Sequence, residues 1–255
     1  MGVTGWIVTA AIAVAGLAVG CWTTPLAARI ARGESPWRPA GQRAAGQSPA
    51  PMAGRFPLPG WVRRRAGHGE SKSAFGAWYP AAALITAAGL VAVWLRLGAS
   101  PELPAFCYLA VLAVPLALID TRYQRLPDVL TLPSYPVALA LLGAGAPFVP
   151  GGGRHLAVAL IGMAAVWLFF ALQVLIYPAG MGWGDVKLSG LIGLYLGWFG
   201  PRALLAGVLG GYLLAAVTGV VLLAARRAGR KSRLPFGPFM LAGALTVIVI
   251  PALSR

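Results

Sequence analysis

Long apolar segments recur along most of the chain, and their lengths approach the roughly 20 residues that a helix needs to cross a bilayer. The first extends from about residue 5 to residue 28. Hydrophobic residues make up 58% of the 255 residues and charged residues only 11%, whereas a soluble domain carries roughly a quarter charged residues. The sequence therefore predicts an all-α, polytopic integral membrane protein.

Seven further apolar segments follow, with Pro and Gly at most of their junctions, which gives about eight predicted transmembrane helices. They cover about residues 76–97, 104–119, 129–149, 155–177, 186–199, 202–225 and 236–253. The segment at 186–199 is short and rich in glycine, so a tilted or partly re-entrant helix is an alternative there. The helix count depends on this segment.

Basic residues lie in the gaps between the apolar segments. The net charge of +15 is therefore not gathered on one soluble face, which argues against nucleic acid as a partner. With the N-terminus outside, 17 of the 21 Lys and Arg residues fall on the cytoplasmic side, as the positive-inside rule predicts. This topology puts the loops at 120–128, 178–187 and 226–235 on the same side, where they can converge on one site.

The chain divides into two predicted parts. Residues 1–75 comprise the first helix, which is too long for a signal-peptide core and follows no basic region, and a stretch rich in Pro, Gly, Ala and Arg at about 29–73. We interpret this stretch as a cytoplasmic loop whose arginines lie near anionic membrane lipids, with a small folded domain as the alternative. Residues 76–255 form the main membrane domain.

Three of the six acidic residues, Asp120, Asp128 and Asp185, each adjoin an apolar segment. An ionised carboxylate at such a place is costly unless it is paired, wetted or protonated, so these residues are functional candidates. The alternative is that they mark helix ends and pair with nearby cations such as Lys187. Lys187 itself could lower the pKa of a carboxylate or hold a lipid headgroup.

Gly182 and Gly184 come directly before Asp185. Glycine permits an extended or left-handed backbone without a side chain, which would let a substrate peptide approach. Two carboxylates brought close together share a proton, so one acts as base and the other as acid. Such a pair can activate a water to attack a peptide carbonyl without a bound metal.

Other chemistries find less support in the sequence. The two histidines, His68 and His155, fall in loops that this topology places on opposite sides, which argues against a Ser-His or Cys-His arrangement. Cys21 and Cys107 lie inside apolar segments and form no CxxC pair, so neither a disulfide framework nor a zinc site is expected. The alternative function is a small proton- or cation-coupled transporter that uses the same aspartates, which would place them near the bilayer midplane.

Three stretches resemble the type IV prepilin peptidases, a family of bacterial membrane aspartic proteases within the wider Gly-x-Gly-Asp group. They are Asp120 to Leu126-Pro127-Asp128, then Gly182-Trp183-Gly184-Asp185-Val186-Lys187, and Leu234-Pro235-Phe236-Gly237-Pro238-Phe239. The resemblance implies that Asp120 and Asp185 are the catalytic pair. It makes Asp128 a structural or substrate-positioning carboxylate, with Gly182, Gly184 and Lys187 in supporting roles.

The resemblance also implies a substrate and a location. Such enzymes cut the basic leader from type IV pilin-like or pseudopilin precursors at the cytoplasmic face of the bacterial inner membrane, and they need no cofactor for it. Bifunctional members carry CxxC motifs linked to zinc in the first cytoplasmic loop and methylate the new N-terminus with S-adenosylmethionine. The loop at 29–73 has no cysteine, so no zinc is expected, S-adenosylmethionine is needed only if methylation is retained, and methylation stays open.

Overall fold

A computed structural model describes residues 3–31, 79–124, 126–178, 181–225 and 234–254. These residues form helices and no strands. The helices are α1 (Val3–Ala31), α4 (Tyr79–Leu97), α5 (Leu103–Tyr123), α6 (Asp128–Gly145), the 3-10 turn η1 (Ala146–Phe148), α7 (Gly152–Ile176), α8 (Trp183–Phe199), α9 (Pro201–Ala224), α10 (Gly237–Val249) and α11 (Pro251–Ser254). Each of the eight predicted apolar segments is helical, which confirms the all-α prediction.

Six of the described helices are long and apolar enough to cross a membrane: α1, α4, α5, α6 with η1, α7 and α9. The protein is therefore a multi-pass membrane protein. With 17 and 13 residues respectively, α8 and α10 are shorter than these six. The predicted segment at 186–199 is one unbroken helix, buried from Val186 to Trp198 except at Lys187, so neighbouring helices cover the backbone of this glycine-rich stretch.

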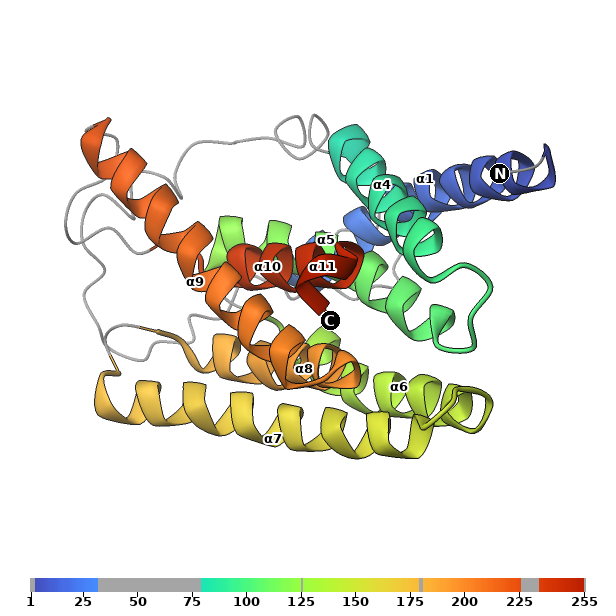
Figure 1. Ribbon diagram of the computed structural model, residues 1–255. Coiled ribbons are helices and arrows are strands. Elements are labelled where there is room, and N and C mark those ends of the chain that lie inside the picture. Colours follow the sequence, from blue (N-terminus) through green and yellow to red (C-terminus); the bar gives the residue numbers. More distant parts are fainter. Residues whose placement is uncertain (1–2, 32–78, 125, 179–180, 226–233, 255) are drawn as a thin grey trace, which may run out of the picture.

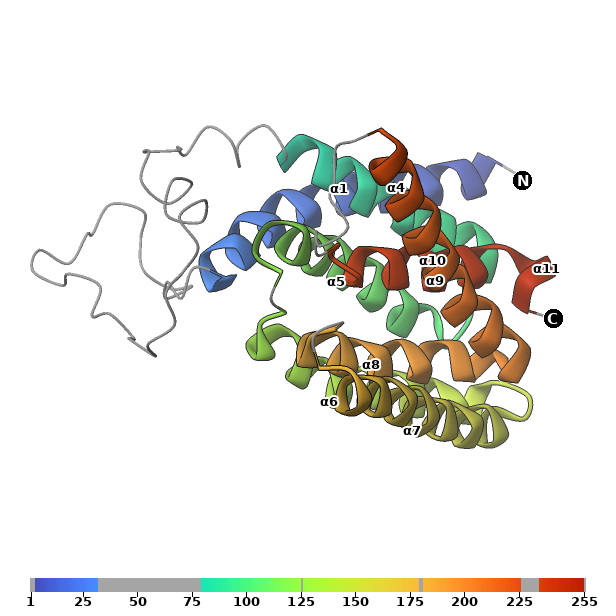
Figure 2. The same cartoon turned by 90° about the vertical axis from the view of Figure 1, so that its left-hand side faces the viewer.

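Close helix packing depends on small residues. A Cβ atom at Gly193 of α8 would lie 2.5 Å from the carbonyl oxygen of Gly162 on α7, and one at Gly197 would lie 2.8 Å from the Cα of Ala159. Such contacts let helix backbones approach each other, as is common between transmembrane helices. Figures 1 and 2 show α7 running alongside α8 and α1 alongside α4.

The register between α5 and α8 decides where the aspartates lie. The Phe106 ring of α5 contacts Tyr195 and Phe199 of α8, with centroid separations of 5.4 and 5.1 Å. Asp120 follows Phe106 by 14 residues, and Asp185 precedes Phe199 by 14 residues, or about 21 Å along each helix at the α-helical rise. Since the two helices run in opposite directions, contact at Phe106 brings the aspartates to the same end.

Two predicted loops lie outside the described residues. They are the basic stretch at 29–73 beyond Ala31 and the arginine-containing stretch at 226–233. The division of the chain near residue 75 also falls there and stays a prediction, as does the orientation of the N-terminus. Within the described part, α1 packs against α4 and α5 of the main domain.

Candidate active site

Asp120 occupies the last turn of α5 and is buried, with 5% of its surface exposed. Its Oδ2 accepts a hydrogen bond of 3.0 Å from the backbone N–H of Gly237, the first residue of α10. A helix N-terminus carries unpaired N–H groups and a partial positive charge, so it favours an anionic partner. A Cβ on residue 237 would lie 2.8 Å from the same oxygen, and hence glycine permits this contact.

Asp185 lies in the first turn of α8, outside the six candidate membrane spans. Its Oδ2 accepts a long hydrogen bond of 3.4 Å from the backbone N–H of Gly182. Its Oδ1 is buried and has no hydrogen-bond partner among the described residues. Burial raises the pKa of Asp185 to about 6, with a further rise from the Asp120 carboxylate that the Gly182 N–H partly offsets.

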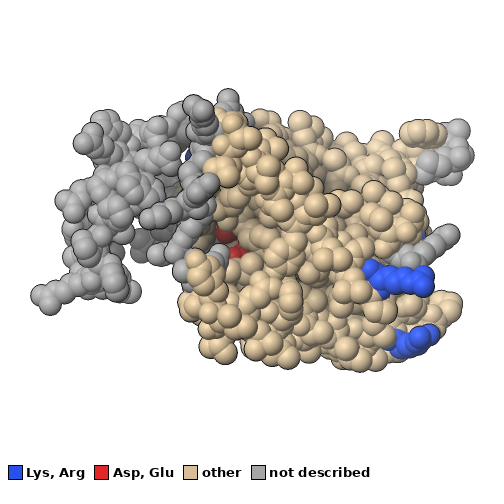
Figure 3. Space-filling model, turned by 60° about the vertical axis from the view of Figure 1, so that its left-hand side comes forward, with Lys and Arg blue, Asp and Glu red and all other residues tan. Residues whose placement is uncertain are grey.

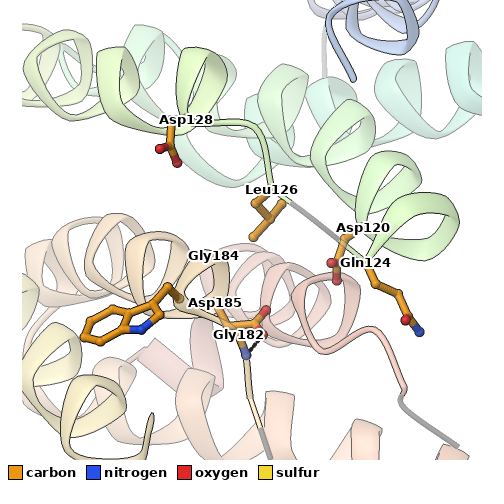
Figure 4. A pocket seen from close by; sticks show the side chains of 8 residues that line it. Asp120, Gln124, Leu126, Asp128, Gly182, Gly184 and Asp185 are labelled. Atoms are coloured by element: carbon orange, nitrogen blue, oxygen red, sulfur yellow. Dashed lines mark hydrogen bonds between the residues drawn. The ribbon is translucent and has the colours of Figure 1, made fainter. Parts of the chain in front are cut away.

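The two aspartates line one pocket of about 260 Å³ at this end of the helices. In Figure 4 their carboxyl groups point toward the same space, one from α5 and one from α8. Figure 3 shows acidic atoms recessed in a hollow of the surface. The complete lining is Asp120, Gln124, Leu126, Asp128, Gly182, Trp183, Gly184 and Asp185.

Asp128 and Lys187 form an ion pair at the edge of this pocket. Lys187 Nζ lies 2.6 Å from Asp128 Oδ1, and the side chains are 32% and 56% exposed, respectively. The Tyr135 hydroxyl donates a hydrogen bond to the backbone carbonyl of Lys187. Two contacts thus tie Lys187, near the start of α8, to α6. An ion pair this exposed adds at most about 1 kcal/mol to stability.

The glycines before Asp185 differ in their surroundings. Gly182 is extended, with φ −89° and ψ 155°, and a Cβ there would meet nothing closer than 3.9 Å. A Cβ on Gly184 would lie 3.1 Å from the Cβ of Leu126, so this glycine lets α8 approach the segment between α5 and α6. Neither glycine has the positive φ that the sequence allowed for.

The structure adds two residues to those predicted from the sequence. Gly237 lies within the third stretch of the family resemblance, which assigned it no role. Gln124 lies between Asp120 and Asp128 and lines the pocket. Neither residue type signals chemistry by itself; Gln124 is four residues from Asp120 in sequence, whereas only the fold brings Gly237 to Asp120.

His155 lies at the other end of α8 from Asp185. Its Nδ1 is 2.8 Å from the carbonyl oxygen of Trp198, in the last turn of α8, while Asp185 is in the first turn. No histidine lines the pocket. The described residues contain no group of three His, Cys, Asp or Glu residues placed to hold a metal ion.

Comparison with known proteins gives a consistent result. Residues 107–224 match the model of the type IV leader peptidase family, a range that contains all three candidate aspartates. The chain is 33% identical over 207 residues to a prepilin leader peptidase/N-methyltransferase of Aeromonas hydrophila, covering 78% of this chain and 68% of the relative. It is 29% identical over 251 residues to a Pseudomonas aeruginosa protein of the same name, covering 88% and 84%.

A Bacillus subtilis protein of that name is 32% identical over 168 residues, covering 66% of this chain and 64% of the relative. No solved structure matches the chain significantly.

Proposed function

Since the chain belongs to the type IV leader peptidase family, we propose that it cuts the leader from pilin-like precursors with Asp120 and Asp185 as the catalytic pair. Membership makes the protein a membrane peptidase, and the proposal concerns its mechanism and substrate. The observation that carries it is the pocket in which carboxylates from two distant segments, the end of α5 and the start of α8, face the same space.

The surroundings of the two carboxylates support a division of labour. Asp120 accepts a hydrogen bond from the backbone N–H of Gly237 at the start of α10, which stabilises a negative charge on Asp120. Asp185 has one oxygen buried without a described partner and a pKa raised to about 6, so it holds a proton more tightly than an ordinary carboxyl group does. We therefore assign the resting proton to Asp185 and the base to Asp120, although the pair titrates as a unit.

In the proposed reaction, Asp120 takes a proton from a water molecule as the water oxygen attacks the scissile carbonyl. Asp185 donates its proton to the carbonyl oxygen, and a tetrahedral adduct forms. Collapse of the adduct breaks the C–N bond, the nitrogen leaves with the proton held on Asp120, and a hydroxyl group of the adduct returns a proton to Asp185 as the carbonyl reforms. The products are the free leader carboxyl group and the free amino terminus of the remaining chain.

The depth of the aspartates separates this proposal from the transporter alternative. A transporter binds its cargo near the bilayer midplane, whereas Asp120 lies in the last turn of α5 and Asp185 in the first turn of α8. Both are at helix ends, where a peptide can enter from the aqueous side. By the predicted topology, this end faces the cytoplasm of a bacterium.

The test is cleavage of a pilin-like precursor by the full chain in lipid vesicles, followed by gel shift and mass spectrometry. Asp120→Asn and Asp185→Asn should each abolish leader removal, because Asn keeps the shape but cannot exchange the proton. Asp128→Asn should reduce leader removal less, since Asp128 lies at the edge of the pocket as one half of an exposed ion pair. Cleavage retained by a folded Asp120 or Asp185 variant would exclude the dyad.

The same mass spectra test methylation. The relatives are named as N-methyltransferases as well as peptidases, and the 29–73 region of this chain lacks cysteine. We propose that the peptidase works without S-adenosylmethionine or zinc. A product heavier by one methyl substitution, seen only when S-adenosylmethionine is added, would show that transfer is retained.

A further inference from the structure

A cluster of aromatic rings lies at the start of α10. Phe236, directly before Gly237, has its ring centroid 5.0 Å from that of Tyr212 on α9 and 6.0 Å from that of Phe170 on α7. The rings of Phe170 and Tyr212 are also in contact, at 5.7 Å. Favourable ring pairs have centroids roughly 4.5–7 Å apart. Three segments that are distant in sequence thus meet at the residue that precedes the N–H bound to Asp120.

Tyr212 is fixed within this cluster by a hydrogen bond. Its hydroxyl donates to Oε1 of Gln173 at 2.8 Å, and Gln173 lies three residues after Phe170 on α7. The neighbouring Gly211 lies where α9 packs against α10, as Figure 1 shows, since a Cβ on Gly211 would lie 3.1 Å from the Cα of Met240. The tyrosine ring is therefore tied to α7 beside a close contact between α9 and α10.

Phe236 has the cap position of α10 without the usual means of fixing it. Polar side chains such as Ser or Asp commonly cap a helix by accepting an N–H of the first turn, whereas Phe236 makes no such bond. The N–H of Gly237 is left for Asp120 Oδ2, at 3.0 Å. Among the described residues, the ring contacts tie position 236 to α7 and α9.

We propose that Tyr212 is a positioning residue of the peptidase, whose ring fixes Phe236 and so keeps the Gly237 N–H within hydrogen-bonding distance of Asp120. This inference rests on the proposed function. Tyr212 does not line the pocket, so it acts on the reaction through this contact. A general base must stay within reach of the water that it deprotonates, and a fixed N–H donor keeps the Asp120 carboxylate in place.

The first test compares Tyr212→Leu with Tyr212→Phe by precursor cleavage, using the full chain in lipid vesicles. Leu removes the ring but keeps an apolar side chain, so kcat should fall about 3- to 10-fold through loss of one aromatic contact. KM should change little, because Tyr212 lies outside the pocket. Phe keeps the ring and its contact with Phe236, so it should retain kcat within about twofold.

The matched control is Phe169→Leu. The Phe169 ring also contacts Phe170, at 5.6 Å, but it is an exposed side chain on α7. Replacing it removes one ring contact of the same kind from the neighbourhood of the cluster. This variant should keep the wild-type kcat and KM.

A second test separates positioning from a general loss of stability. Gly237→Ala displaces the Asp120 carboxylate directly, so Tyr212→Leu should lower kcat no further in a protein that already carries Gly237→Ala. Independent structural effects would instead add in free energy and multiply in rate. Tm measured on the same preparations establishes that each variant is folded.

Two results overturn the inference. One is a folded Tyr212→Leu protein with wild-type kcat. The other is a Tyr212→Leu effect of the same size with and without Gly237→Ala. If Tyr212→Leu does not fold, Phe236→Leu removes the same ring contact from its other side and takes both measurements. In every case Asp120→Asn and Asp185→Asn would still be inactive, so failure here is distinct from failure of the proposed dyad.

Discussion

The hydrogen bond between Gly237 and Asp120 makes a sharp prediction for Gly237→Ala. An added Cβ would lie 2.8 Å from Asp120 Oδ2 and 3.3 Å from its Cγ, well inside the about 3.5 Å of a comfortable nonbonded contact. The carboxylate must then move by about half an ångström or more, because the Leu188 side chain lies on another side, 3.4 Å from the same Cβ. Such a shift lengthens the 3.0 Å bond from the Gly237 N–H.

The expected size of the effect follows from the type of bond. A hydrogen bond to a charged group contributes roughly 1.5–3 kcal/mol, and each 1.4 kcal/mol is about tenfold in rate. We expect kcat to fall about 10- to 100-fold. KM should change little, because Gly237 does not line the pocket. The helix itself should tolerate the change, since Ala favours helix by about 1 kcal/mol over Gly.

The assay is precursor cleavage at saturating peptide, with Tm measured on the same preparation. The matched control is Gly210→Ala in α9, where the added Cβ would meet its nearest neighbour at 3.8 Å, an ordinary contact. The control should keep wild-type kcat. A Gly237→Ala protein with wild-type kcat and Tm would refute the claim that this N–H holds Asp120 in its working position.

Three further outcomes are expected. Asp185→Asn should raise Tm above that of the wild type at pH 7.5 but not at pH 4, because a folded-state pKa of about 6 makes wild-type stability fall as pH rises from about 4 through 6. The gain in stability at pH 7.5 should be about 1–2 kcal/mol after allowance for partial exposure. Equal Tm differences at the two pH values would show that Asp185 ionises freely. A double-mutant cycle with Asp128→Asn and Lys187→Met should give a coupling below about 1 kcal/mol that shrinks in high salt; a larger, salt-insensitive value would contradict the exposed pair. Gly193→Ala should cost about 1–3 kcal/mol by overpacking α7 against α8, while Gly143→Ala, with no atom within 4 Å of the new Cβ, should leave Tm unchanged; equal effects would count against close helix packing.

Sequence reasoning reached much of this architecture because a bilayer makes local composition decisive. Each predicted apolar segment is helical in the structure, and six helices meet the length and composition needed to cross a membrane. Backbone N–H and C=O groups in lipid need hydrogen-bond partners within the segment itself, and a helix supplies them, so a long apolar segment is expected to be helical. The three aspartates could also be singled out from the sequence, because a charge beside lipid is costly.

The roles of the glycines needed tertiary contacts. Gly182 and Gly184 were expected to let a substrate approach, which stays a prediction, and the structure adds that Gly184 lets α8 approach Leu126. Gly237 had no predicted role, and its N–H binds Asp120 across 117 positions of sequence. A glycine looks the same in sequence whether it faces a helix, a carboxylate or open space, so its neighbours decide what it does.

The sequence by itself determined that this is a helical membrane protein with few carboxylates near the spans, which it predicted as the site, and it marked the family. The tertiary structure decided which carboxylates share a pocket, which of them is paired with Lys187, and which N–H groups and amide side chain surround them. The physical reason is the range of the interactions involved. Helix formation and lipid solvation act over one segment of sequence, whereas the site is made where the ends of α5, α8 and α10 meet.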